Sequence, residues 1–269
     1  KLRSQDISAL ILRGNALAGL KSFDDALKSI EEAIRLEPDR GATFTQKGFI
    51  ELARGRREEA EQTFKYAIKL APDAIEGYLA LGSYYWALGR PKEAEQTFHT
   101  ALKIKPTDAA TNRALASLYL ATARTSEAEQ YLRTVADTSG DPVSAMELAN
   151  YYLIVGRSKD AITRLTPLAS GDKKIPAART MLARAHALSG DRAKARAIVD
   201  EALKADRHDL EAQLIDGQLL NGAGPHDARL AAVKEAANAH PTSAEAQLLL
   251  GKLYAARGDI EPAEDAFRQ

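Results

Sequence analysis

The chain contains no cysteine among its 269 residues. This absence excludes a disulfide framework, a thiolate metal site and a cysteine nucleophile, and it leaves the cellular compartment undetermined. The chain also lacks a net charge, because 37 basic residues balance 37 acidic residues. A balanced chain does not have the electrostatic footprint of a protein that binds nucleic acid or an anionic membrane. We therefore expect no nucleic-acid partner.

Long hydrophobic runs and aromatic residues are scarce. No stretch approaches the roughly 20 consecutive apolar residues that a membrane-spanning helix needs, and residues 1–6 do not resemble a signal peptide. Direct membrane insertion is therefore not expected of this chain. Aromatic residues make up only 6% of the sequence, whereas Ala, Leu, Glu, Lys and Arg recur throughout. Because these five residues favour helices, the composition predicts an all-α fold.

An internal repeat organises the sequence. Pro38, Pro72 and Pro106 are 34 residues apart, and each follows a run with the composition of a helix. A self-similar period of this length is typical of repeat proteins. The same frame fits eight repeats, which start near residues 7, 41, 75, 109, 142, 176, 210 and 244, and the last of them is incomplete at Gln269.

Small residues recur at fixed places in each repeat. Position eight is occupied by Gly14, Gly48, Gly82, Ala116, Ala149, Ala183, Gly217 and Gly251. Alanine recurs at position twenty, and a large apolar residue such as Ile30, Phe64 or Phe98 follows four residues later. A spacing of four places both on one face of a helix. Each repeat is therefore expected to contain two helices, at about positions 2–14 and 18–30, that approach closely at the small residues.

These positions make the sequence resemble tandem tetratricopeptide repeats (TPR). The third repeat matches the family pattern best, with Tyr78, Leu81, Gly82, Tyr85, Gly89, Ala94, Phe98, Ala101 and Pro106. The resemblance implies a right-handed superhelical solenoid of antiparallel helix pairs, formed by residues 1–269 as a single domain, with the first helices lining its concave face. The incomplete last repeat and residues 1–6 predict a fragment of a longer array, whose uncapped ends would permit self-association.

The sequence departs from the family pattern at a few places. Glu51 stands at position eleven of the second repeat, where an aromatic residue is expected, and the sequence offers no partner for it. Arg229 replaces the alanine of the seventh repeat, which predicts a shifted helix pair. The loops at residues 139–142 and 171–176 replace the single closing proline, so altered angles between repeats are expected there.

Catalytic patterns are lacking. The five histidines lie in different repeats and form no helical pair at metal-ligand spacing. His186 occupies the place of a packing aromatic residue and is expected in the core. Gly222–Pro225 follows a helix and lacks the lysine of a phosphate-binding loop, so it is interpreted as a turn. We therefore predict no enzyme activity, no cofactor and no metal site.

The remaining surface is the expected groove. In this family, positions two, five, nine and twelve of the first helix face the concave side. The resemblance therefore implies a partner-binding groove that includes Asn15, Phe49, Leu79, Ser83, Trp86, Arg113, Met146, Asn150 and Arg184. Trp86 has two interpretations, an interface anchor or ordinary packing between neighbouring first helices. Asn15 and Asn150 are expected either to pair with a ligand backbone or to be solvated.

The sequence therefore predicts a non-enzymatic scaffold that binds a protein or peptide, as an extended segment or a helix, in the concave groove. Two alternatives stay open. The first is a TPR part of a bacterial surface polysaccharide or protein export and assembly system, which long alanine-rich arrays resemble. The second is a regulatory TPR region of an enzyme whose catalytic domain lies outside residues 1–269.

Overall fold

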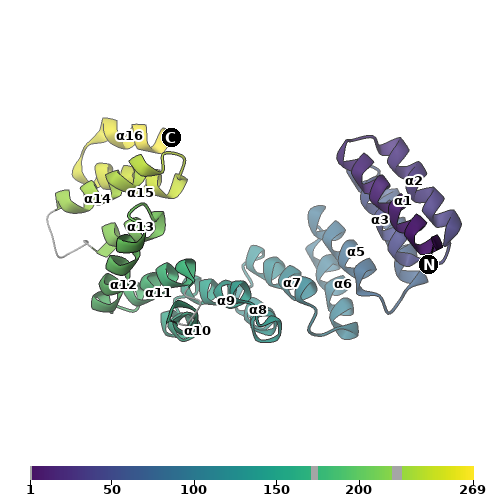
Figure 1. Cartoon of the computed structure of the whole chain (residues 1–269), viewed down its shortest axis with the longest axis horizontal. Helices are drawn as coiled ribbons and strands as arrows, with labels where there is room; N and C mark the ends of the chain where they lie inside the picture. The colour runs from purple at the N-terminus through teal and green to yellow at the C-terminus, as the bar shows by residue number, and fades with distance from the viewer. Residues whose placement is uncertain (1, 171–174, 220–225) are drawn as a thin grey trace. The chain divides into compact units, whose positions relative to one another are not determined.

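The computed structural model describes residues 2–170, 175–219 and 226–269, and in this part of the chain all regular structure is helical. Sixteen helices pair consecutively as about eight repeats, as the sequence predicts (Figure 1). The chain divides into two compact units, Lys1–Ser139 and Gly140–Gln269, called unit 1 and unit 2. Each unit is a stack of helix pairs. The predicted continuity of a single solenoid across both units stays a prediction.

Unit 1 contains four helix pairs. They are α1 (Leu2–Gly19), α2 (Phe23–Leu36), α3 (Gly41–Ala53), α4 (Arg57–Leu70), α5 (Ile75–Ala87), α6 (Pro91–Ile104), α7 (Ala109–Ala121) and α8 (Thr125–Ser139). Unit 2 contains α9 (Pro142–Ile154), α10 (Ser158–Ser170), α11 (Pro176–Leu188), α12 (Arg192–Ala205), α13 (Leu210–Leu219), α14 (His226–Ala239), α15 (Ala244–Arg257) and α16 (Ile260–Arg268). For most helices these bounds confirm the predicted positions within the repeat to about a residue. The exceptions are α1, which begins at Leu2 and so includes the residues expected to end a preceding element, α13, described only to Leu219, and α16, which ends at Arg268.

The turn between the two helices of a repeat requires a left-handed backbone at position fifteen. Five glycines occupy it with φ between 70° and 90°: Gly55, Gly89, Gly156, Gly190 and Gly258. Glycine adopts this conformation without the steric cost that a Cβ atom brings. Lys21 and Ala123 stand at the same position in the first and fourth repeats and adopt φ 59°.

We expect Ala123→Gly to stabilise unit 1 by about 1 kcal/mol, because it relieves a left-handed alanine in a turn. The reverse change, Gly89→Ala, should cost about as much. No atom lies within 4 Å of a Cβ built on Gly89, so the cost would come from the backbone alone. Urea unfolding of the two variants measures both effects, and equal stability of wild type and Ala123→Gly would contradict the argument.

The two helices of a repeat approach closely where small residues meet large ones. A Cβ atom built on Gly48 would lie 2.5 Å from the Phe64 ring, and one on Gly82 would lie within 3.0 Å of the Phe98 ring. Phe64 is fully buried. The alanines at position twenty are fully buried in the first six repeats. The predicted small-to-large packing is therefore confirmed.

Most first helices of successive repeats contact one another within each unit. Contacts join α1 to α3, α3 to α5 and α5 to α7 in unit 1, and α9 to α11 and α11 to α13 in unit 2. No comparable contact joins the second helices among the described residues. From α1 to α7 in unit 1 and from α9 to α13 in unit 2, the first helices therefore form the inner layer, as the resemblance implies.

The sequence departures have different outcomes. Glu51 does have partners, because Thr63 Oγ1 donates to its carboxylate at 2.7 Å and Lys47 Nζ lies 3.7 Å from it. Before α9, Gly140 takes φ 66° and Asp141 caps the helix by accepting from the Ser144 backbone N–H. Residues 171–174, the turn predicted at 222–225 and the Arg229 side chain lie outside what the structure describes.

Candidate functional site

The predicted groove residues of unit 1 lie on its inner layer. We define the first-helix face as positions two, five, nine and twelve of α1, α3, α5 and α7. Six predicted site residues belong to it: Asn15, Phe49, Leu79, Ser83, Trp86 and Arg113. Asn15, Phe49, Ser83 and Trp86 are exposed, and Leu79 and Arg113 are half-buried. The helix contacts bring these residues onto one face of the unit, although their role in binding stays a prediction.

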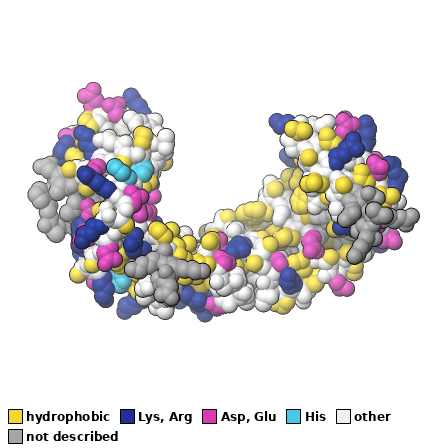
Figure 2. All heavy atoms as spheres, in the orientation of Figure 1, with side chains coloured by type: hydrophobic (Ala, Val, Ile, Leu, Met, Phe, Trp, Pro, Cys, Tyr) yellow, Lys and Arg dark blue, Asp and Glu magenta, His cyan; other side chains and the backbone are white. Residues whose placement is uncertain are grey.

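Large apolar side chains are exposed on this face. Phe49, Trp86 and Leu120 are 42%, 37% and 36% exposed, and they come from α3, α5 and α7. The Phe49 ring packs edge-on against buried Phe64, with ring centres 5.2 Å apart, so it is held in place while part of it meets solvent. Figure 2 shows hydrophobic side chains over the region of α5 and α7. An apolar surface that alternates with small polar residues is typical of a protein-binding surface.

The other three predicted site residues lie in unit 2. Met146 is half-buried and Asn150 is exposed, both on α9. Arg184 on α11 forms an ion pair with Glu211 and lies 3.7 Å from Glu245. Burial raises the pKa of Glu211, while the Arg184 guanidinium acts to lower it. Arg184 is therefore already engaged by two carboxylates, a pairing across three repeats that the single-repeat pattern does not predict.

A polar clamp joins successive repeats in unit 1. Arg90 stacks over the Tyr85 ring at 4.4 Å and donates to Glu61 of the preceding repeat at 2.8 Å. Arg124 repeats this arrangement, 4.4 Å above the Tyr119 ring and 2.6 Å from Glu95. We call each set a Glu-Arg-Tyr clamp. Its signal in the sequence is tyrosine at position eleven, arginine at sixteen and glutamate at twenty-one of the preceding repeat.

The clamp holds its carboxylate charged. Burial acts to raise the pKa of Glu61, but hydrogen bonds from Lys65, Arg90 and Tyr85 outweigh it and lower the pKa to about 2. Hydrogen bonds from Arg124, and secondarily from Tyr119, lower the pKa of Glu95 in the same way. Such charge-assisted bonds between neighbours fix the relation of one repeat to the next and so hold the first-helix face in shape.

A second recurrent feature is a notch between the two helices of a repeat, lined by positions four, seven, twenty-three and twenty-six. Leucine at position seven is buried there in the third to sixth repeats: Leu81, Leu115, Leu148 and Leu182. In the first, second and seventh repeats the residue is Arg13, Lys47 or Asp216, and a cavity of about 460 Å³, 290 Å³ or 130 Å³ lies beside it. A charged residue at position seven is a sequence signal that marks these cavities.

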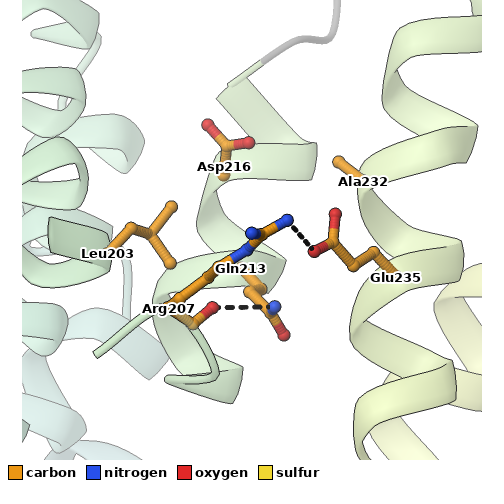
Figure 3. A pocket seen from close by; sticks show the side chains of 6 residues that line it. All are labelled: Leu203, Arg207, Gln213, Asp216, Ala232 and Glu235. Atoms are coloured by element: carbon orange, nitrogen blue, oxygen red, sulfur yellow. Dashed lines mark hydrogen bonds and ion pairs between the residues drawn. The ribbon is translucent and has the colours of Figure 1, made fainter.

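The seventh-repeat notch is occupied by its own ion pairs (Figure 3). Arg207 reaches across it to Glu235 at 3.1 Å, and Asp216 pairs with Arg196. Gln213 donates from Nε2 to the Arg207 carbonyl at 3.0 Å, and its buried Oε1 accepts no hydrogen bond from the described residues. Its charged groups thus neutralise one another.

No group of three His, Asp or Glu side chains among the described residues could hold a metal ion. His186 is buried, as predicted for a core residue, and burial lowers its pKa. In the loop before α13, Asp206 and Asp209 accept backbone N–H groups from His208 and Ala212, which is the chemistry of a turn and a helix cap. None of the described helices combines the length and hydrophobicity needed to cross a membrane.

Solved structures share this architecture. A TPR repeat-containing protein from Cytophaga hutchinsonii, in its C-terminal part, aligns with a TM-score of 0.65 at 16% identity, covering 88% of this chain and 97% of that one. Pseudomonas aeruginosa PilF aligns with a TM-score of 0.53 at 17% identity over 80% and 98%. YrrB, described as a TPR protein with an unusual peptide-binding site, aligns with a TM-score of 0.52 at 18% identity over 68% and 95%. At these identities the likeness shows the fold. The search of curated proteins found no match.

Family models match most of the sequence. A Tetratricopeptide repeat model matches residues 51–110, 85–149 and 152–219, a second matches 11–75 and a third matches 245–269. These matches agree with the repeat frame, the helix pairs and the left-handed turns. The chain belongs to the tetratricopeptide repeat family.

Proposed function

We propose that the chain is a non-enzymatic scaffold that binds a protein segment, as an extended peptide or a helix, on the first-helix face of unit 1. Tetratricopeptide repeat domains are generally protein-interaction scaffolds. The observation that carries the proposal is the exposure of Phe49, Trp86 and Leu120 on three adjacent first helices. Exposure of large apolar groups to water is unfavourable, and the free energy falls when a partner covers them.

The chemistry of the face defines the ligand. Apolar side chains of the partner would pack on Phe49, Trp86 and Leu120, while Asn15 and Ser83 offer hydrogen bonds to its backbone. YrrB, which shares the fold, has a peptide-binding site. Met146, Asn150 and Arg184 extend the proposal to unit 2, where Arg184 would have to exchange its carboxylate partners for a ligand.

Peptide selection tests the proposal directly. Peptides would be selected from a random phage-displayed library on the purified chain. Trp86 is the only tryptophan, so its emission reports contacts at the face. We expect a blue shift on binding, because a ligand would shield the exposed part of the indole. We expect Trp86→Ala to weaken calorimetrically measured binding at least about tenfold, since aromatic anchors dominate interface energies.

A matched control separates this face from general stickiness. Leu20 is 78% exposed but lies in the turn after α1, outside the face. Leu20→Ala should change affinity less than twofold. If Trp86→Ala and Phe49→Ala both bind selected peptides as tightly as wild type, the first-helix face is not the site.

The bacterial export or assembly role is a narrower proposal. PilF, from a bacterium, shares the fold at an identity that carries no function across. The regulatory role beside a catalytic domain is likewise a proposal. The sequence of the source gene on either side of residues 1–269 tests both, because an export system and a catalytic domain each have a recognisable sequence.

A further inference from the structure

The second-repeat notch contains a buried carboxylate beside aromatic walls. Its cavity of about 290 Å³ is lined by Phe44, Lys47, Glu51, Glu59, Gln62, Thr63 and Tyr66. Phe44 and Tyr66 form one wall, with their rings edge-on and 4.8 Å apart. Tyr66 is 44% exposed, so part of this wall meets solvent.

Glu51 is poorly satisfied for a buried charge. Its residue is 6% exposed, and it accepts one hydrogen bond, from Thr63 Oγ1 at 2.7 Å. Lys47 Nζ lies 3.7 Å away, beyond hydrogen-bond distance, and is also 4.0 Å from Glu31. A buried carboxylate normally needs several donors to offset its lost hydration. The cavity beside Glu51 leaves room for another donor.

The environment of Glu61 shows which donor fits a partly buried carboxylate in this chain. Glu61 accepts from Lys65 at 2.7 Å and, at the same time, from Arg90 at 2.8 Å, and the Arg90 guanidinium lies over the Tyr85 ring, 4.4 Å from its centre. A carboxylate, a lysine one helical turn away and an aromatic ring thus hold a guanidinium. The second-repeat notch offers the same groups with no arginine among its lining residues. Guanidinium is planar, stacks on rings and tolerates partial burial better than ammonium.

We propose that the second-repeat notch binds the guanidinium of an arginine side chain presented by a protein partner. The carboxylates of Glu51 and Glu59 line it and Glu31 lies beside it, against the single positive charge of Lys47. The local charge therefore favours a cation. The seventh-repeat notch is a poorer candidate, because its two carboxylates are already paired with Arg196 and Arg207. The proposal does not depend on the first-helix face, because the notch uses other repeat positions.

Two-dimensional amide NMR with small probes tests the proposal. N-acetyl-arginine methylamide imitates an arginine within a protein, and the equivalent lysine compound is the matched probe. We expect the arginine compound to shift the amides of Glu51, Thr63 and Tyr66 saturably, with a dissociation constant of about 1–10 mM for so small a ligand. The lysine compound should bind at least fivefold more weakly. Equal binding of the two compounds would overturn the proposal, and so would shifts spread evenly over both units.

Two variants identify the carboxylate. Glu51→Gln should weaken binding at least tenfold, and Glu51→Tyr, which restores the residue found at position eleven of later repeats, should abolish it by filling the notch. Glu201→Gln removes an exposed carboxylate of α12 and should leave binding unchanged. If Glu51→Gln does not fold, the Glu51→Tyr variant decides. If a folded Glu51 variant bound the arginine compound as tightly as wild type, Glu51 would not be the carboxylate that binds it. If free arginine bound ten times more tightly than the capped compound, the ligand would be the free amino acid and not an arginine of a protein, which would overturn the proposal.

Discussion

Replacing Phe64 by alanine is expected to lower the free energy of unfolding of unit 1 by about 3–5 kcal/mol, the usual cost of removing a buried phenylalanine ring. Phe64 is fully buried at position twenty-four of its repeat and packs directly over Gly48. Its ring also contacts Phe49, at 5.2 Å between centres, and Tyr84, at 6.0 Å. Gly48 has no side chain that could move into the cavity left by the alanine substitution. Urea unfolding followed by Trp86 emission reports this unit, because the tryptophan lies on α5.

The partner of Phe64 provides the control. Gly48→Ala would place a methyl group 2.5 Å from the ring and should cost about 1–3 kcal/mol through overpacking. Adding Phe64→Leu to Gly48→Ala should recover part of that loss, because the double variant reproduces the pair Ala116 and Leu132 of the fourth repeat. A double variant no more stable than Gly48→Ala alone would contradict a direct steric coupling between the two positions.

The same exchange of volume runs along the chain. Glycine at position eight accompanies phenylalanine at position twenty-four in the second, third and eighth repeats, whereas alanine accompanies leucine or valine in the fourth, fifth and sixth. The combined volume of the two side chains therefore varies less among these repeats than the volume of either side chain alone, as close packing of the two helices requires. The seventh repeat is an exception, because it combines glycine at position eight, Gly217, with valine at position twenty-four, Val233.

Periodic features of the fold could be predicted because they depend on contacts within one repeat. The helix pairs, the left-handed glycines at position fifteen and the packing of Gly48 on Phe64 each follow from residue types at fixed spacing. Local sterics dominate these features, so one repeat predicts the next. The fully buried alanines at position twenty are a further example.

Features that depend on pairs of repeats could not be predicted in the same way. Arg184 meets Glu211 and Glu245 only because three repeats stack. The division into two units also lies above the level of a single repeat. The sequence predicts which repeat positions lie on the first-helix face. Whether the apolar residues at these positions bind a partner depends on that partner, which the sequence does not contain.

The Glu-Arg-Tyr clamp around Glu61 is an example of such a pairwise feature with a measurable consequence. Glu61 accepts a hydrogen bond from Tyr85 at 3.0 Å in addition to those from Lys65 and Arg90. The Tyr84 hydroxyl lies 3.4 Å from Glu61, but it donates at 2.9 Å to the Arg57 carbonyl. Its side chain is 19% exposed, so water offers it little compensation for a lost partner. Two of these three donors, Tyr85 and Arg90, come from the next repeat, and the carboxylate therefore stabilises an interface between repeats.

We expect Glu61→Gln to destabilise unit 1 by about 2–3 kcal/mol at neutral pH and by progressively less in acid. The folded-state pKa of Glu61 is lowered to about 2 from an ordinary value of 4.5. A carboxyl group with a depressed pKa contributes stability that is fully present above the ordinary value and is lost as the pH falls through the folded value. The difference between wild type and Glu61→Gln should therefore be largest above about pH 4.5 and shrink toward pH 2. Urea unfolding at several pH values, read by Trp86 emission, measures it.

The comparison with a neighbouring acid isolates the clamp from general acid denaturation. Glu58 lies on the same helix and is exposed, so Glu58→Gln removes the same charge at a solvated place. Exposed charges contribute little to stability, and we expect this variant to stay within about 0.5 kcal/mol of wild type at every pH. Both variants lose one negative charge, so a difference between them reports the hydrogen bonds of Glu61. If Glu61→Gln instead lost the same free energy at about pH 3 as at pH 7, the ionised carboxylate would not be what joins the second repeat to the third.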